Sequence, residues 1–289
     1  MNNNGIQRGA AAGSKSKKIV GLIIRYLVLL LVLVILVTPL VWQLSTSLKG
    51  KGVGLYTRPP QFWPEDASLA AYGEVTRIVP ILKYTINSVI VAIICLIGNV
   101  FGATAAGYAL AKFQFKGRKF AMGVFIVGIV MPTETILIAR YMLMQSLSLN
   151  NTLLGIALPS LVGAMNVLLM RNAISGIPSS LEEAAMIDGA NAWQRFIRII
   201  IPSVKGTMAV VAIFSFVAAW DDFLWPLLVM SDQNKYTLTI GLNYLQGTFA
   251  NDPRVVAAGT IIAIMPILIL FFALQKYFFQ GVGEGGIKG

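Results

Sequence analysis

Six long apolar stretches are the feature of this sequence that most constrains its fold. They run roughly from Ile19 to Leu44, Ile86 to Ala111, Phe120 to Met144, Thr152 to Ile174, Met208 to Met230 and Val255 to Phe278. A hydrocarbon core about 30 Å thick takes about 20 helical residues to cross, and a helix satisfies its own backbone hydrogen bonds there. Each stretch is long enough. The sequence therefore predicts an all-α, polytopic membrane protein with six transmembrane helices.

The composition agrees with a chain that lies in lipid. Of the 289 residues, 56% are hydrophobic and 12% are charged, whereas about 25% are charged in an ordinary soluble domain. The net charge of +11 is interpreted as a topology signal and as contact with anionic lipid headgroups. A nucleic-acid site would require basic residues gathered on one soluble face, so no nucleic-acid partner is predicted.

The basic residues also predict which ends of the helices face the cytoplasm, because lysine and arginine concentrate in short cytoplasmic loops. With the amino terminus inside, the cytoplasmic segments contain Arg8, Lys15, Lys17, Lys18, Lys112, Lys116, Arg118, Lys119, Arg171, Arg195, Arg198, Lys205, Lys276 and Lys288. The outer segments contain fewer, although residues 45–83 carry five. We therefore expect both termini in the cytoplasm, a cytoplasmic tail over residues 1–18, and a transmembrane domain over 19–289.

The sequence offers little for catalysis. It contains no histidine, which is the commonest catalytic base and metal ligand, and its one cysteine, Cys95, lies inside the second apolar stretch. An intrachain disulfide is therefore excluded. No catalytic residue, no metal site and no bound cofactor are predicted for this chain.

One polar segment, about residues 178–205, separates the fourth and fifth apolar stretches and is patterned as two short helices. Ser179 and Glu182 have the spacing of a capping box at the start of the first helix. Gly189 can end that helix, since glycine tolerates a left-handed backbone. Asn191 and Gln194 can cap the second helix in the same way.

The second helix carries an apolar stripe with basic residues beside it. The stripe consists of Trp193, Phe196, Ile197, Ile200 and Ile201. Such a helix can lie in the membrane interface with its basic residues on lipid headgroups, or it can dock on a protein partner. Amphipathicity alone leaves both alternatives open.

The order of residues in this segment resembles the EAA loop of ATP-binding-cassette importer permeases. The matching positions are Glu183, Ala184, Ala185, Gly189, Ile199 and Pro202, and Ile201 stands where the family usually has leucine. Asp188, Ala190 and Phe196 resemble the form of the loop found in carbohydrate-uptake permeases of the maltose-permease type. Further similarity is found at Pro39, Trp42, Ser47, Leu48, Lys49, Asn87, Ser88, Ala106, Tyr108, Ala109, Phe113, Gly117, Gly281, Gly285, Ile287, Lys288 and Gly289.

The resemblance implies the type I importer permease fold in a bacterial or archaeal plasma membrane. It also implies three partners: a second related permease, a dimeric cytoplasmic ATPase and an extracytoplasmic solute-binding protein. ATP and Mg²⁺ would be bound by the ATPase, since this chain has no GxxxxGK[ST] phosphate loop. The residues expected to couple it to the ATPase are Glu182, Glu183, Ala184, Ala185, Asp188, Gly189, Phe196 and Pro202.

Four residues of the fifth stretch are candidates for the solute path. They are Trp220, Asp221, Asp222 and Trp225. In this part of the stretch, Trp220, Asp221, Asp222, Phe223 and Pro226 resemble a tryptophan–asparagine motif of the family, with Asp221 in place of asparagine. A tryptophan can stack on a sugar ring, and a charge near a membrane span can mark a path. Helix packing and ion pairing are the alternatives. Glu134 and Arg140, near the third stretch, can likewise contact solute or cap a membrane edge.

The expected function is the permease subunit of a binding-protein-dependent, ATP-driven importer, with an oligosaccharide, polyol or glycerol-phosphate solute. The chain itself is expected not to be an enzyme. A secondary transporter driven by an ion gradient is the alternative, but the sequence contains no detectable inverted halves. An integral-membrane enzyme is disfavoured by the absence of histidine and of clustered carboxylates.

Overall fold

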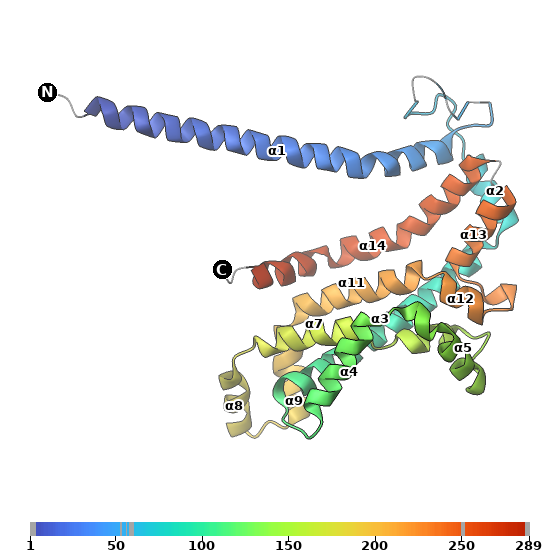
Figure 1. Ribbon diagram of the computed structural model, residues 1–289. Coiled ribbons are helices and arrows are strands. Elements are labelled where there is room, and N and C mark those ends of the chain that lie inside the picture. Colours follow the sequence, from blue (N-terminus) through green and yellow to red (C-terminus); the bar gives the residue numbers. More distant parts are fainter. Residues whose placement is uncertain (1–3, 53, 56, 58–60, 250–251, 287–289) are drawn as a thin grey trace. The chain divides into compact units, whose positions relative to one another are not determined.

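The computed structural model describes residues 4–52, 54–55, 57, 61–249 and 252–286, and regular structure in these ranges is helical (Figure 1). Their only strand-like pairing is an isolated bridge between Lys49 and Ala67. The chain divides into two compact units. One contains Met1–Glu74 with Asn251–Ile261, and the other contains Val75–Ala250 with Ile262–Gly289.

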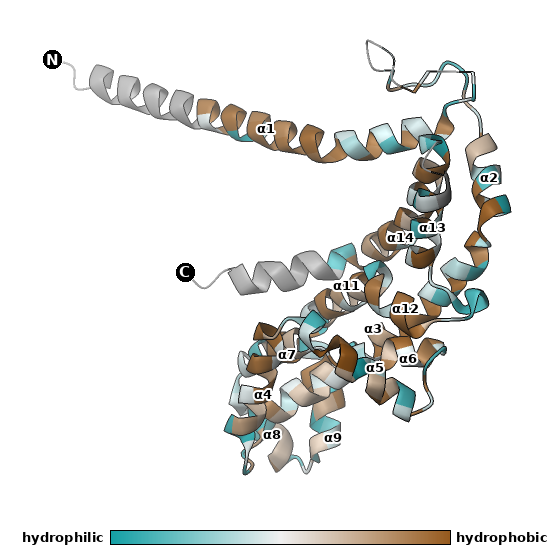
Figure 2. Ribbon diagram, turned by 45° about the vertical axis from the view of Figure 1, so that its right-hand side comes forward, coloured by the Kyte–Doolittle hydropathy of each residue, from teal (hydrophilic) through white to brown (hydrophobic). Residues whose placement is uncertain are grey.

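The first unit is dominated by the long helix α1 (Asn4–Leu48). The helix begins well before Ile19. The boundary that the sequence predicted between the tail (1–18) and the transmembrane domain (19–289) therefore marks a change from polar to apolar residues within one helix. In Figure 2 the middle part of the α1 ribbon is coloured as mostly hydrophobic. The large apolar side chains of residues 19–37 are exposed, which is suited to lipid. Near the end of α1 the Lys49 ammonium lies 4.6 Å from the centre of the Trp42 ring.

The second unit is built around α3 (Ile81–Lys112), which follows the short helix α2 (Ala70–Ile78). Helices α7 (Ala164–Ser175) and α11 (Lys205–Asp221) both pack along α3. The approach of α3 to α7 is close at Gly107. A Cβ atom at Gly107 would lie 2.8 Å from the backbone nitrogen of Arg171 and 2.9 Å from Cβ of Met170.

A side chain at position 107 should therefore push α3 and α7 apart. We expect Gly107→Leu to lower the free energy of unfolding by about 3 kcal/mol, because overpacked cores lose about 1–3 kcal/mol and a backbone atom cannot move aside. Thermal unfolding in detergent measures this. Gly123→Leu is the matched control, since a Cβ at Gly123 meets nothing within 4 Å. Equal melting temperatures for the two variants would contradict the close approach.

The described residues contain three helices long and apolar enough to cross a membrane, and up to six spans if each bent helix pair counts as one. The third stretch forms α4 (Arg118–Val130), η1 (Thr133–Ile136) and α5 (Leu137–Ser146), with a bend of 104°. The break falls at Met131, whose ψ of 125° is extended. Pro132 follows it, and proline disfavours helical geometry in the preceding residue.

The fourth and fifth stretches are also interrupted. The fourth forms α6 (Leu153–Ala157), η2 (Leu158–Ser160) and α7, with a bend of 46°. The fifth was expected as a continuous span to Met230, but α11 ends at Asp221, and the extended Asp222 leads into α12 (Leu224–Val229). The described chain continues through η4 (Gln233–Lys235), α13 (Leu238–Phe249) and α14 (Pro253–Gly286).

Candidate functional site

The segment between α7 and α11 forms two short helical parts joined by a sharp turn. Its elements are α8 (Ser179–Ile187), α9 (Ala192–Arg195), the π-helical turn η3 (Phe196–Ile200) and α10 (Ile201–Ser203). Gly189 has φ = +81° at the turn, as its position predicted. The Asn191–Gln194 capping box is confirmed, with both of its hydrogen bonds at 2.9 Å. We call residues 178–203 the loop segment.

The predicted capping box of Ser179 and Glu182 is wrong. The residue before the first turn of α8 is Pro178, and no side chain caps that turn. The Glu182 side chain is instead buried, with 6% of its surface exposed. Its carboxylate accepts a hydrogen bond of 3.0 Å from the Tyr108 hydroxyl and lies 3.1 Å from Nζ of Lys112. An ion pair within the chain has replaced the local cap.

This ion pair attaches α8 to the end of α3. Lys112 also donates a 2.8 Å hydrogen bond to the carbonyl of Ile177, immediately before α8. Because a buried charge is costly unless it is paired, Glu182 and Lys112 hold each other in place. We therefore expect Glu182, placed among the ATPase contacts from the sequence, to position α8 from within the chain.

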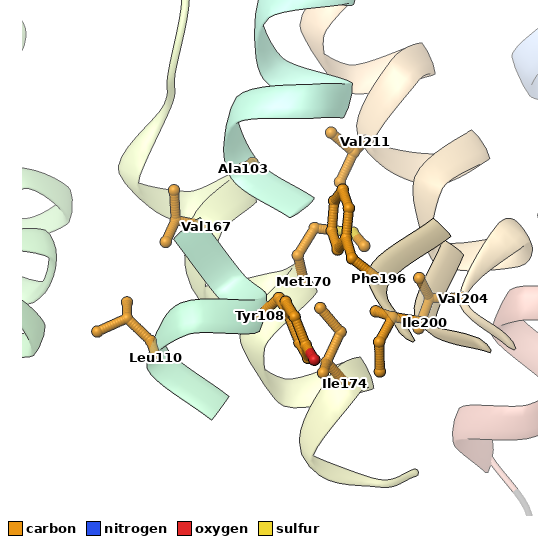
Figure 3. Close-up of a cluster of buried hydrophobic side chains, with 10 residues drawn as sticks. All are labelled: Ala103, Tyr108, Leu110, Val167, Met170, Ile174, Phe196, Ile200, Val204 and Val211. Carbon is orange, nitrogen blue, oxygen red and sulfur yellow. The ribbon is translucent and has the colours of Figure 1, made fainter. Parts of the chain in front are cut away.

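Phe196 is also turned into the chain's own core. It is 6% exposed, and its ring stacks on Tyr108 with centroids 5.5 Å apart. Figure 3 shows it in the apolar cluster formed with Ile200, Met170 and Ile174. The apolar stripe of the second helix is thus divided. Phe196 and Ile200 anchor the loop segment, whereas Trp193 and Ile197 remain on the surface.

The remaining coupling residues lie at the surface. Glu183, Ala184, Asp188, Gly189 and Pro202 are exposed, and Ala185 is half-buried. Large apolar side chains accompany them: Leu181 (51% exposed), Met186 (49%), Ile187 (87%), Trp193 (66%) and Ile197 (44%). The sequence analysis missed Met186 and Ile187, because the apolar residues of α8 form no stripe that periodicity would detect.

The two tryptophans of the candidate solute path are packed inside the second unit. Trp220 is 3% exposed, stacks on Phe216 and donates a 3.1 Å hydrogen bond to the carbonyl of Ala263. Trp225 is 2% exposed and donates a 3.2 Å hydrogen bond to the carbonyl of Ile156. Neither indole offers a free N–H donor, so helix packing accounts for both residues.

The two adjacent aspartates have different surroundings. Asp221 is the last residue of α11 and is exposed. Asp222 is half-buried, and its carboxylate accepts a 3.3 Å hydrogen bond from the backbone of Trp225. Arg140 reaches the same region from α5, with its guanidinium carbon 4.4 Å from the centre of the Trp225 ring. Glu134 is exposed and bonds only locally, to the Thr133 hydroxyl at 3.2 Å.

Arg140 and Asp222 line a cavity of about 550 Å³ in the second unit. Asn99 fixes one wall, because its side chain donates to the carbonyls of Cys95 and Ser160 and accepts from the amide of Gly163 and from Asn166. The sequence analysis did not select Asn99 or Asn166. The sequence feature that could have identified these two residues is an amide side chain inside an otherwise apolar stretch. Among the described residues, no group of three His, Cys, Asp or Glu side chains can hold a metal ion.

Apolar helices, a rigidly anchored polar loop and a polar cavity between helices together define a membrane permease. The sequence matches the family of binding-protein-dependent transport system inner membrane components over residues 9–284. The chain belongs to this family. The predictions of a helical membrane permease, of a subunit of a binding-protein-dependent transport system and of a protein other than an enzyme are thereby confirmed.

Curated relatives lie within the same class. The arabinooligosaccharides transport permease AraQ of Halalkalibacterium halodurans is 35% identical, over 70% of this chain and 73% of that protein. The galactooligosaccharides transport permease GanQ of Bacillus subtilis is 31% identical, over 96% of this chain and 99% of that protein. The sulfoquinovosyl glycerol transport permease SmoH of Agrobacterium fabrum is 31% identical, over 87% of this chain and 88% of that protein.

Two solved structures share the fold. A bacterial ABC transporter that imports the acidic polysaccharide alginate has a chain with a TM-score of 0.78 at 24% identity, covering 91% of this chain and 98% of that one. The alginate transporter in complex with its pentasaccharide-bound periplasmic protein has a TM-score of 0.64 at 14% identity, over 90% and 94%. These likenesses support the importer permease fold expected from the sequence.

Proposed function

We propose that this chain is one permease half of an ATP-driven importer of oligosaccharides, coupled to a cytoplasmic ATPase through the exposed side of the loop segment. The observation that carries the coupling role is the contrast between the two sides of α8. Glu182 is fixed inside the chain by Lys112 and Tyr108, whereas Ile187 at the end of the helix is 87% exposed. A rigid anchor on one side and an exposed apolar end on the other suit a docking element that transmits displacement.

The exposed residues have the chemistry of a protein contact. Ile187, Met186 and Trp193 supply apolar area, and aromatic side chains and methionine are enriched in the cores of such interfaces. Glu183 and Asp188 can accept charge-assisted hydrogen bonds from a basic partner surface. The small side chains of Ala184 and Ala185 permit close approach. A helix lying in the membrane interface would instead keep its acidic residues away from anionic headgroups.

The partners follow from this assignment. A second, related permease would complete the translocation path, and an extracytoplasmic solute-binding protein would deliver the cargo. A dimeric ATPase would bind ATP and Mg²⁺, since this chain lacks the phosphate loop. The loop segment must then face the cytoplasm, as must both termini if six spans are crossed, and the excess of basic residues on that side supports this orientation.

The solute class is supported by the relatives. Proteins named for arabinooligosaccharides, galactooligosaccharides, lactose and diacetylchitobiose are 29–35% identical to this chain over most of its length. Their cargoes share several ring hydroxyl groups and are neutral. We therefore assign a short oligosaccharide to this importer.

Purification of the tagged chain from its own membranes in mild detergent tests the assignment. We expect an ATPase and a second permease to co-purify, and the complex in vesicles to take up an oligosaccharide only with ATP and the binding protein present. Uptake by this chain alone, driven by an ion gradient, would replace the proposal with a secondary transporter.

A further inference from the structure

The cavity of about 550 Å³ between α3, α5, α7 and α11 of the second unit is the feature that the coupling role leaves unexplained. Its volume lies within the range of about 300–1,000 Å³ that is typical of small-molecule sites. The polar side chains on its wall include Thr133, Arg140, Asn166, Ser215 and Asp222. A cavity with this lining in an apolar helix bundle calls for a polar occupant.

Arg140 is the most unusual member of the lining. Ionisable residues inside membrane segments are rare, and they most often mark the path of a substrate or ion. One face of the Arg140 guanidinium is held against the Trp225 ring, while its Nε atom is buried and has no hydrogen-bond partner in the described part of the chain. A guanidinium held by its flat face keeps its N–H donors available at its edge.

Asp222 supplies the opposite charge. It lines the same cavity as Arg140. One of its carboxylate oxygens, Oδ1, accepts the backbone hydrogen bond from Trp225, and a carboxylate has two oxygens with about four acceptor positions. Arg140 can therefore still donate hydrogen bonds into the cavity and Asp222 can still accept them. The opposite charges of the two side chains cancel.

Asn166 adds a further acceptor. Its Nδ2 donates to Asn99 at 2.8 Å and to Ser215 at 3.1 Å, so the amide of this cavity-lining residue is oriented by its neighbours. Its Oδ1 is an acceptor that these two hydrogen bonds do not use. Fixed donors and acceptors around this cavity match the ring hydroxyl groups of a sugar, each of which both donates and accepts.

We propose that this cavity is a binding subsite for one neutral glycosyl unit of the cargo, with Arg140 donating to its hydroxyl groups and Asp222 and Asn166 accepting from them. The inference rests on the proposed oligosaccharide importer and deepens it. It places specificity in this chain, in addition to any selection by the binding protein. It also assigns recognition to Asp222, at the break after α11, and to Arg140 of α5, in place of the buried tryptophans.

The experiment uses the complete importer in vesicles, with uptake of a neutral galactooligosaccharide compared with uptake of the same sugar carrying a uronic acid. Asp222→Asn, Arg140→Gln and the control Glu65→Gln, at an exposed carboxylate outside the cavity, are compared with wild type. Wild type and the three variants receive cargo from the same binding protein. The preference of the binding protein for one sugar therefore cancels when uptake by a variant is divided by uptake by wild type. Co-purification of the ATPase and the second permease verifies that each variant assembles.

We expect Asp222→Asn and Arg140→Gln each to raise the half-saturating concentration of the neutral sugar by about tenfold, the effect of losing one charge-assisted hydrogen bond. Asp222→Asn leaves the Arg140 charge uncompensated, so it should also shift the preference toward the acidic sugar by about tenfold. Glu65→Gln should change neither quantity by more than about twofold, since Glu65 does not line the cavity. Values for Asp222→Asn and Arg140→Gln equal to those of Glu65→Gln would overturn the subsite.

A second variant keeps the test decisive if the charge variants fail to assemble. Ala218 lies on α11, is exposed and lines the cavity, so Ala218→Leu narrows the space without removing a buried contact. Loss of uptake in an assembled Ala218→Leu complex supports the subsite, and unchanged uptake refutes it. If wild type takes up no oligosaccharide with ATP and binding protein present, the proposed function itself has failed.

Discussion

Tryptophan in place of Gly189 should release the ATPase from the purified complex. Gly189 has φ = +81°, where a residue with a Cβ atom is strained by about 1 kcal/mol. A Cβ at this position meets nothing within 4 Å, so the chain should still fold while the bulky ring projects from the turn at the proposed docking surface. We expect the ATPase recovered with the tagged chain to fall by about tenfold or more, which corresponds to at least 1.4 kcal/mol of binding.

Gly117→Trp is the matched control. Gly117 has φ = +91° at the turn before α4, and a Cβ there also meets nothing within 4 Å. The backbone strain and the added side chain are thus the same, but the position lies outside the loop segment. Equal loss of ATPase from both variants would show that strain in the chain, and not the docking surface, causes the effect. Full retention by both would place the contact elsewhere.

Removal of the Lys112 ammonium should loosen α8 from the rest of the chain. Lys112→Ala leaves the Glu182 carboxylate buried at 6% exposure with only the Tyr108 hydroxyl as a partner. Breaking a buried ion pair by deleting one member costs about 3–5 kcal/mol. We expect backbone amides of residues 179–187 to exchange hydrogen at least about a hundredfold faster in Lys112→Ala, since local opening follows this free energy.

Two further variants separate the ion pair from the loss of a lysine in general. Lys116→Ala removes an exposed lysine from the same end of the unit and should leave the exchange rates at wild-type values. Glu182→Gln in the Lys112→Ala background removes the unpaired buried charge and keeps an acceptor for Tyr108, so it should recover part of the protection. An unchanged exchange rate in Lys112→Ala would mean that apolar packing around Phe196 and Ile200 holds the loop segment by itself.

The same ion pair links the loop segment to transport. If Lys112 positions α8, the Lys112→Ala complex should retain its ATPase but lose the stimulation of ATP hydrolysis by cargo-loaded binding protein. This pattern differs from that of Gly189→Trp, in which the ATPase itself is lost. The two variants thus distinguish a residue at the proposed contact from a residue that positions it.

The turn at Gly189 was predictable from the sequence because it depends on a few neighbouring residues. The class of protein was predictable because it depends on the composition of long stretches of the chain. Gly189 and the Asn191–Gln194 pair act over three or four residues, so their spacing alone predicted the turn and the cap. The apolar stretches predicted membrane helices because each helix must satisfy its backbone in lipid. The residues resembling the importer loop led to the family that the chain matches over residues 9–284.

The tertiary structure decided where the polar side chains point and where the helices break. Glu182 was expected to cap its own helix or meet a partner, but Lys112 and Tyr108, about 70 residues away in sequence, pair with it. A cavity lined by several helices likewise has no local signature. The sequence therefore suggested the tryptophans beside Asp222 and could not show that both indoles are buried. Sequence spacing determines which residues share a helix face, whereas burial and pairing depend on which helices meet.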